Sequence, residues 1–393
     1  MKLITSRFVF DGSRLLPDDT AVLMKKNMVI EVGKRRVLSH TYGLSCIDCG
    51  YSLLVPGFVN LHTHIELSHL EGSMPAKVGF VEWLKAIMIA KATSRGVDRT
   101  AMERAVERMI RSGVRLVCDI SNDAVSASVL SEFLPGSILF LERYGLRYSV
   151  AREVIRTISN ELNLLREKYP SIHVYPTAHA VYSTHPELLG YLATLEPSFP
   201  FSMHFLESDQ ERLFLSGRGE LYELLDAMGL IDCEFSYTSP VEYIRQRGIL
   251  RRGTFFVHMV DASYEEFSAV AESGCGVCFC PGSNLYISGQ LPDVCAALRS
   301  GVRIGIGTDS LASNLDLNIL RELGIIFEHF ECVRPQRLFG WATSEGASII
   351  GGELGFKSGS VAYPCYFSVD SYQPLEELLE KGAKNIAPDC INV

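Results

Sequence analysis

Eight hydrophobic runs that alternate with segments of helical period constrain the fold of this 393-residue chain more than any other feature. Each run is almost continuously apolar, which is typical of a parallel strand buried on both faces. Eight strand–helix units make an α/β fold of the (β/α)8 barrel type, and a doubly wound open sheet is the alternative. The predicted strands are Phe58–His64, Val114–Ser121, Ser137–Tyr144, His173–Ala180, Phe201–Ser208, Thr254–Val260, Gly276–Ser283 and Val302–Asp309.

The two ends of the chain lack this alternation. Short apolar segments separated by turn clusters fill the first 55 residues, and a glycine-rich stretch at 351–360 precedes a predicted strand over Val361–Val369. We therefore expect residues 1–55 and 347–393 to form a small composite β-sandwich beside a barrel of residues 56–346. Other expected elements are strands over Leu3–Phe10, Ala21–Leu23 and Met28–Val32, and helices over Thr100–Ser112, Val154–Tyr169, Glu211–Met228, Tyr264–Glu272 and Pro292–Ser300.

Composition and charge narrow the class of protein. The chain has 37 basic and 46 acidic residues, a formal charge of −9, which disfavours binding to nucleic acid or to an anionic membrane. Residues 1–7 contain no long apolar segment typical of a signal peptide, and no apolar run suits a transmembrane helix. We expect a cytoplasmic protein with reduced cysteines that acts on a small molecule. The oligomeric state stays open, a homodimer included.

Titratable residues stand where several of the predicted strands end. His62 and His64 differ by two positions, so a strand presents both imidazoles on one face. In a barrel the carboxyl ends of the strands meet, and His204 and Asp309 complete a set of three nitrogens and one carboxylate. This set suits one divalent metal, zinc above all, with iron or manganese as alternatives. Satisfied core histidines are the competing interpretation.

A metal-bound water still needs groups that accept and donate protons. Glu207 follows His204 by three positions and is the candidate proton shuttle, while His258 ends strand six and can hydrogen-bond the attacking oxygen. Asp309 can accept a proton from the water as well as bind the metal. Together these residues indicate metal-assisted hydrolysis at an sp² carbon.

Three cysteines in strand seven allow two interpretations. Cys275 and Cys278 have Cys-x-x-Cys spacing, and Cys280 follows, so the group could bind a metal. The cysteines lie within an apolar run, and a strand would separate Cys275 from the other two onto opposite faces. We expect core packing.

Residues after strands one and three are candidates for substrate binding. Arg143 and Arg147 could bind an anionic tail, and Glu82 could accept hydrogen bonds from ribose hydroxyls while Trp83 covers the pocket. Ordinary loop or core packing is the alternative for all four residues.

In combination and order, these segments resemble the amidohydrolase superfamily, in particular its branch of nucleobase and nucleoside deaminases and triazine hydrolases. The resemblance covers nearly the whole chain. It implies a (β/α)8 barrel with a flanking β-sandwich built from both chain ends. The matching segments are Val55–His64, His179–Ser183, His204–Glu207, Cys280–Asn284 and Gly307–Asn314.

The resemblance also implies roles for single residues. It assigns His62, His64, His204 and Asp309 to one metal, Glu207 and His258 to catalysis, and His179, Ser310 and Asn314 to substrate contact. Binuclear relatives carry a carboxylated lysine at the end of strand four. The only lysine between Arg115 and His185 is Lys168, which precedes that strand, so a mononuclear site is expected.

Within the superfamily, His64–Leu70 and Thr308–Asn314 look like the aminodeoxyfutalosine deaminases of menaquinone biosynthesis. Those enzymes convert a 6-aminopurine nucleoside to the 6-oxo form and release ammonia. Deamination of adenosine, methylthioadenosine or S-adenosylhomocysteine, and hydrolysis of another amino- or chloro-heterocycle, are the alternatives. A barrel that binds a ligand without turning it over is a third hypothesis, which the presence of Glu207 disfavours.

Overall fold

All eight predicted barrel strands are present in the computed structural model, which describes residues 1–93, 98–384, 386 and 390–393. They form two four-stranded sheets, ordered β10-β9-β8-β7 and β11-β12-β13-β14. Most of their residues are buried, which explains why each run is apolar throughout rather than alternating. The strands are β7 (Phe58–Thr63), β8 (Val114–Ser121), β9 (Ile138–Arg143), β10 (His173–Ala178), β11 (Phe201–Phe205), β12 (Thr254–His258), β13 (Gly276–Phe279) and β14 (Arg303–Ile306).

Backbone contacts join these two sheets at both pairs of outer strands. Next to β7, the Asp309 N–H donates to the His62 carbonyl at 3.0 Å, and Thr63 forms a parallel bridge with Asp309. Between β10 and β11, the His204 N–H donates to the His179 carbonyl at 2.9 Å. The eight strands therefore close into the predicted (β/α)8 barrel, and the closing contacts lie at the strand ends that carry the candidate site.

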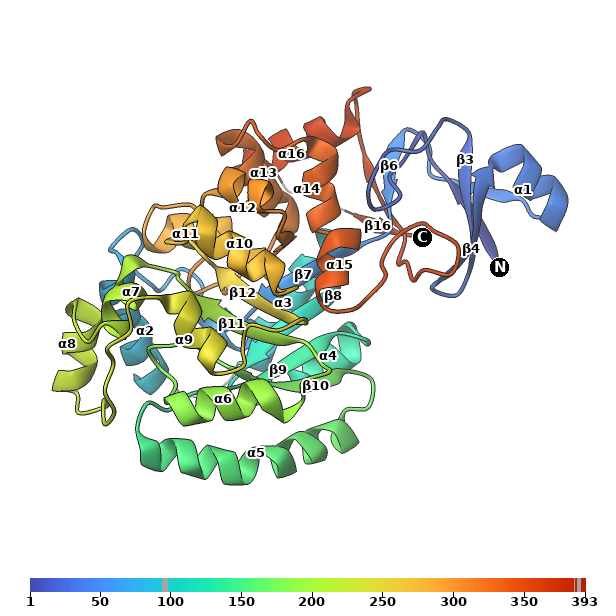
Figure 1. Cartoon of the computed structure of the whole chain (residues 1–393). Helices are drawn as coiled ribbons and strands as arrows, with labels where there is room; N and C mark the ends of the chain where they lie inside the picture. Colours follow the sequence, from blue (N-terminus) through green and yellow to red (C-terminus); the bar gives the residue numbers. More distant parts are fainter. Residues whose placement is uncertain (94–97, 385, 387–389) are drawn as a thin grey trace. The chain divides into compact units, whose positions relative to one another are not determined.

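Helices follow the barrel strands, and α5 and α6 lie side by side against β10 (Figure 1). The predicted helix Glu211–Met228 is in fact two helices, because Gly217 and Gly219 adopt φ angles of +71° and +92°, which a helix cannot continue through. The helices are η1 (Ile65–Leu70), α2 (Phe80–Thr93), α3 (Arg99–Arg111), α4 (Ala127–Phe133), α5 (Tyr148–Lys168), α6 (Pro186–Leu195), α7 (Asp209–Leu215), α8 (Glu220–Ala227), α9 (Pro240–Gln246), α10 (Tyr264–Glu272), α11 (Pro281–Ile287) and α12 (Val294–Ser300).

The described chain divides into two compact units, one of residues 61–106 and 117–317, the other of residues 1–60, 107–116 and 318–393. The first contains every candidate site residue. The second contains the β-rich chain ends, and the domain boundaries at residues 55 and 347 stay a prediction. Its helices are α1 (Arg35–Tyr42), α13 (Ile319–His329), α14 (Pro335–Trp341), α15 (Ser344–Ile349) and α16 (Pro374–Ala383).

Two sheets in this second unit share a core. Their orders are β4-β3-β1-β5 and β16-β15-β6-β2, and β15 pairs antiparallel with β6, so the two chain ends meet in one sheet. Ile4, Val22 and Leu54 pack in a common buried cluster between strands of both sheets. The expected strand Leu3–Phe10 is two strands because the chain passes from one sheet to the other near Ser6. The strands are β1 (Lys2–Thr5), β2 (Phe8–Val9), β3 (Thr20–Lys25), β4 (Met28–Lys34), β5 (Cys46–Asp48), β6 (Ser52–Val55), β15 (Cys365–Ser368) and β16 (Ile391–Asn392).

Helices α13 and α16 approach each other so closely that only glycine fits at their contact. A Cβ atom on Gly324 would lie 2.2 Å from the Ala383 backbone nitrogen, and one on Gly382 would lie 2.1 Å from the Leu320 carbonyl oxygen. Both contacts are far shorter than a van der Waals separation.

Candidate metal centre and active site

Three histidines and one aspartate meet at the carboxyl ends of the barrel strands. His62 belongs to β7, His64 follows it directly, His204 belongs to β11, and Asp309 lies three residues beyond β14. All four side chains are buried, and their ligand atoms lie within 4.8 Å of one another. The structure thus brings together the complete set of predicted metal ligands.

The spacing of these atoms fits a tetrahedral metal ion. Zinc–ligand distances of about 2.0–2.1 Å place the ligand atoms of a tetrahedral site roughly 3.4 Å apart. His62 Nε2 lies 3.1 Å from His64 Nε2, and Asp309 Oδ1 lies 3.6 Å from His62 Nε2 and 3.5 Å from His64 Nε2. Three imidazoles and a carboxylate are ligands that zinc accepts, and iron and manganese are compatible with the same donors.

Hydrogen bonds orient Asp309 and His204 so that their ligand atoms face the metal position. Asp309 Oδ2 accepts from the hydroxyls of Ser283 at 2.6 Å and Ser313 at 2.7 Å, which leaves Oδ1 to face the histidines. His204 Nδ1 donates to the His179 carbonyl at 3.2 Å, which leaves Nε2 as the ligand atom. Such outer partners fix the tautomer and orientation of metal ligands.

Burial keeps these histidines in the form that binds a metal. It lowers the pKa of His64 and of His204 well below the ordinary value for histidine, and the neighbouring His62 lowers both further. The imidazoles are therefore neutral over the physiological pH range, and a neutral imidazole is the form that coordinates a metal.

Two further polar side chains lie beside this ligand set. Glu207 Oε1 is 3.6 Å from His258 Nε2, and both residues line the same cavity as the ligands. Burial raises the pKa of Glu207 well above its ordinary value, and the charges of Asp309 and Glu211 raise it further. Burial lowers the pKa of His258 to about 3, so its ring is neutral.

The proton of the neutral His258 ring can be assigned from its surroundings. The Asn284 amide nitrogen donates to His258 Nδ1 at 3.0 Å, so the proton lies on Nε2. This buried Nε2 has no hydrogen-bond partner among the described residues, and it faces Glu207. A buried donor without a partner indicates that a substrate or water atom binds there.

The backbone is strained at the same strand ends. Leu206, His258, Met259 and Asp309 adopt φ angles of +49°, +74°, +48° and +56°. Positive φ is uncommon for residues other than glycine and costs about 1–3 kcal/mol, and it is retained mainly at functional sites. All four residues end a barrel strand or follow one within three positions, and each is, or is adjacent to, a predicted catalytic or metal-binding residue.

A cavity of ≈590 Å³ opens over the metal position. Its volume lies within the range of about 300–1,000 Å³ that is usual for small-molecule sites. Its polar floor includes three of the ligands, His64, His204 and Asp309, together with Glu207 and His258, and apolar side chains form most of the wall. The apolar wall consists of Leu67, Trp83, Leu84, Ile87, Met88, Leu146, Val150, Tyr182, Leu225 and Leu230.

A model of the amidohydrolase family matches residues 53–362. The chain belongs to the amidohydrolase family. It is 25% identical over 355 residues to the 5-methylthioadenosine/S-adenosylhomocysteine deaminase of Lawsonia intracellularis, covering 86% of this chain and 75% of that protein. It is 24% identical over 375 residues to the aminodeoxyfutalosine deaminase of Deinococcus radiodurans, covering 90% of this chain and 87% of that protein.

Among solved structures, that of Helicobacter pylori aminofutalosine deaminase in complex with methylthio-coformycin superposes with a TM-score of 0.88. The two chains are 22% identical, and the superposition covers 99% of this chain and 97% of that one. The amidohydrolase barrel of this chain is therefore the fold of that structure. As a member of the family the chain is a hydrolase, and the relatives named above are deaminases, which act on C–N bonds.

Lys168, the only lysine between Arg115 and His185, ends α5 and precedes β10, as the prediction of a mononuclear site assumed. No helix in the described ranges combines the length and the apolar character that crossing a membrane requires.

The predicted substrate-binding residues divide into two groups. Trp83, Arg147, His179 and Ser310 line the cavity. The pKa of His179 is lowered to about 3, mainly by burial, so its ring is neutral. Its Nδ1 pairs with the Ser183 hydroxyl at 2.7 Å.

The other predicted residues hold partners outside the cavity lining. Glu82 accepts from Lys85 at 2.6 Å on the exposed face of α2, and Asn314 donates to the Thr308 carbonyl at 2.7 Å. Arg143 forms an ion pair with Glu161 of α5.

Glu142 lines the cavity and was not among the predicted residues. It is buried beside Arg143 in β9, accepts a hydrogen bond from the Asn122 amide at 2.8 Å, and lies 3.8 Å from His204 Nδ1. Successive strand residues face opposite sides, so only one of this Glu-Arg pair can face the cavity. Glu142 could have been identified as another titratable residue at the end of an apolar strand, the pattern that pointed to His62 and His204.

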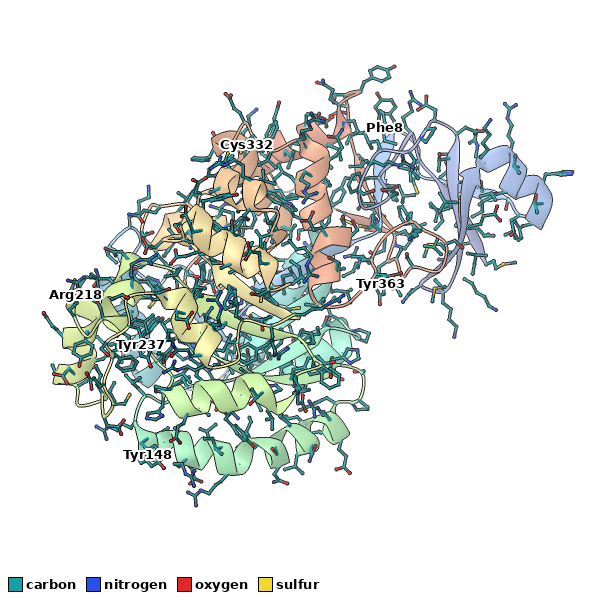
Figure 2. All side chains as sticks on the ribbon, viewed as in Figure 1. Phe8, Tyr148, Arg218, Tyr237, Cys332 and Tyr363 are labelled. Carbon is teal, nitrogen blue, oxygen red and sulfur yellow. The ribbon has the colours of Figure 1, made fainter. Side chains whose placement is uncertain are left out.

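A second group of potential ligands lies away from the barrel floor. His185, Asp232 and Cys233 bring ligand atoms within 4.8 Å of one another. His185 Nδ1, however, accepts from the Glu187 N–H at 3.2 Å, so its proton lies on Nε2, the atom that faces Asp232. Asp232 also accepts from the backbone of Tyr148, which is labelled on α5 in Figure 2. These bonds describe a structural cluster at the start of α5 and α6.

The cysteines of strand seven lie in the core, as expected. Cys275, Cys278 and Cys280 are buried. The Cys275 thiol donates to the Arg251 carbonyl at 3.1 Å. The core-packing interpretation is confirmed for these three residues.

Proposed function

We propose that this amidohydrolase is a zinc-dependent deaminase of a 6-aminopurine nucleoside, with aminodeoxyfutalosine as its preferred substrate. Such an enzyme would act in menaquinone biosynthesis. The observation that carries the proposal is the convergence, in one cavity, of a tetrahedral ligand set with Glu207 and His258. Their positions match what hydrolysis of a heterocyclic C–N bond needs: a metal, a proton shuttle and a donor for the attacking oxygen.

The chemistry follows from what each side chain can hold or move. His62, His64, His204 and Asp309 would hold a zinc ion, which would lower the pKa of a bound water to about 7. Glu207 lies where it can carry a proton to the purine ring nitrogen and later to the departing ammonia. His258 donates from Nε2 to the oxygen that attacks C6. Asp309 would bind the metal through Oδ1, because its Oδ2 accepts from Ser283 and Ser313, and its carboxylate would also accept a proton from the water.

The cavity supports a nucleoside that carries a large 5′ substituent. Its neutral floor histidine His179 suits contact with an uncharged purine ring, and Trp83 offers an aromatic surface. The wall is apolar, and two cations, Lys91 and Arg147, also line it. An apolar tail with an anionic end, as in aminodeoxyfutalosine, is complementary to such a wall.

Methylthioadenosine is the second candidate substrate. Its 5′ substituent is small and apolar, which suits the leucine-rich wall near Leu225 and Leu230 without using the cations. The deaminase from Lawsonia intracellularis carries this substrate in its name, at an identity similar to that of the aminodeoxyfutalosine deaminase.

The test is ammonia release by the zinc-loaded chain with adenosine, methylthioadenosine, S-adenosylhomocysteine and aminodeoxyfutalosine. The proposal predicts turnover of the nucleosides, with the highest kcat/KM for aminodeoxyfutalosine. A higher kcat/KM for methylthioadenosine would make it, rather than aminodeoxyfutalosine, the preferred substrate. Absence of ammonia from all four would overturn the proposed function.

A further inference from the structure

Glu211 occupies the third position of α7, but its carboxyl group does not make the usual capping hydrogen bond. The segment Ser208–Glu211 opens α7 with the Ser-x-x-Glu pattern of a capping box, in which the glutamate normally binds the serine N–H. Helix α10 shows the ordinary arrangement, where the Ser263 N–H donates to Glu266 at 2.9 Å.

In α7 the glutamate reaches one residue further back. Glu211 Oε1 accepts from the N–H of Glu207 at 2.8 Å, and the Leu206 N–H also hydrogen-bonds to this carboxyl group. Leu206 has a φ of +49°, a conformation that bulky residues rarely adopt. The two donors therefore belong to the strained turn that leads from β11 into the proposed proton shuttle.

Burial of the Glu211 carboxyl group costs more free energy than an interaction that only caps α7 would require. Glu211 is fully buried, and its Oε2 has no hydrogen-bond partner among the described residues. Burial raises the pKa of Glu211 to about 7, although the backbone bonds to Glu207 and Leu206 act in the opposite direction. Asp261 and Arg212 also act on this pKa, Asp261 raising it and Arg212 lowering it. A glutamate can cap a helix without full burial, because Glu266 caps α10 while only partly buried.

We propose that Glu211 is a positioning residue for the reaction, whose carboxyl group holds the Leu206–Glu207 backbone so that the Glu207 side chain faces His258 and the metal. This inference rests on the proposed function, in which Glu207 moves the proton. Without the acceptor, the strained turn relaxes toward negative φ, and the Glu207 carboxyl group leaves its place in the cavity.

The experiment compares Glu211→Met, which keeps the volume and removes the acceptor, with Glu211→Gln, whose amide oxygen can still accept. Glu211→Ala serves the same purpose should the Met variant fail to fold. Glu242→Ala is the matched control, because Glu242 holds the same position in the Ser-x-x-Glu segment that opens α9 but its side chain is 45% exposed. All are measured as zinc-loaded full chains with the nucleoside that the wild type turns over best.

The Met variant is expected to lose about 10²-fold in kcat, as misplacement of a catalytic group by about 1 Å does, with KM and zinc content at wild-type values. Glu211→Gln recovers most of kcat, and Glu242→Ala keeps all of it. Wild-type kcat in the Met variant, or equal losses in the Met and Gln variants, would overturn the proposal.

Crystal structures of the same proteins give a readout that does not depend on activity. We expect the Glu207 carboxyl group to be displaced from His258 in Glu211→Met and in place in Glu211→Gln. If the wild type deaminates no nucleoside, the proposed function fails, and these structures alone decide the role of Glu211. An undisplaced Glu207 in the Met variant would then contradict it.

Discussion

Replacing Ser283 by alanine tests whether the hydroxyls behind Asp309 orient it toward the metal. The Ser283 hydroxyl is fully buried and donates to Asp309 Oδ2 at 2.6 Å, while Ser313 donates to the same oxygen at 2.7 Å. A hydrogen bond to a charged group contributes about 1.5–3 kcal/mol, and tenfold in affinity corresponds to about 1.4 kcal/mol. Loss of one outer partner of a metal ligand typically lowers metal affinity about 10–100-fold. The two estimates agree.

We therefore expect Ser283→Ala to weaken zinc binding by about 10–100-fold. The assay is competition for zinc against a chelator of known affinity at neutral pH. Ser288→Ala is the control, because Ser288 follows the same helix α11 and bonds to the Asn284 carbonyl rather than to Asp309. If Ser283→Ala binds zinc as tightly as the control and the wild type, the hydroxyls do not orient Asp309 and the reasoning is refuted.

Two further predictions concern the ligands and the fold. His62→Ala should lose most of the bound zinc in elemental analysis, because one of four ligands is removed, and wild-type zinc content in this variant would contradict the ligand set. Gly324→Ala should lower the free energy of unfolding by about 3 kcal/mol through overpacking against α16, more than the ~1 kcal/mol that alanine gains in helix propensity. Gly340→Ala in α14 is its control, since the added Cβ would meet only the Gly12 carbonyl at 3.7 Å. Chemical denaturation measures both glycine variants, and equal stability would refute the packing argument.

The barrel and its metal ligands were predictable because burial leaves a direct trace in the sequence. A strand covered on both faces must be apolar throughout, so His62, His204 and Asp309 were conspicuous at the strand ends. The two-residue spacing of His62 and His64 then predicted that both side chains lie on the same face of the strand. The predicted fold class is confirmed by the closed barrel, and the structure brings the predicted ligands together.

Other features depend on local geometry that residue type alone does not reveal. Arg143 was predicted as a cation for an anionic tail, whereas strand alternation lets only one of Glu142 and Arg143 face the cavity, and Glu142 lines it. Gly217 and Gly219 divide one predicted helix because both take positive φ, which many helical glycines do not. The reach of Glu211 to Glu207 follows from the strained turn at Leu206, and no spacing rule predicts it.

Single-turnover deamination by Glu207→Gln tests the central claim most directly. Glutamine keeps the size of the side chain but cannot carry a proton, and general acid–base catalysis typically contributes about 10²–10⁴-fold. We expect the variant to keep its zinc and to bind the nucleoside, while the ultraviolet change from 6-amino to 6-oxo purine slows by at least the upper part of that range. A variant that retains its zinc and deaminates at nearly the wild-type rate would show that Glu207 is not the proton shuttle.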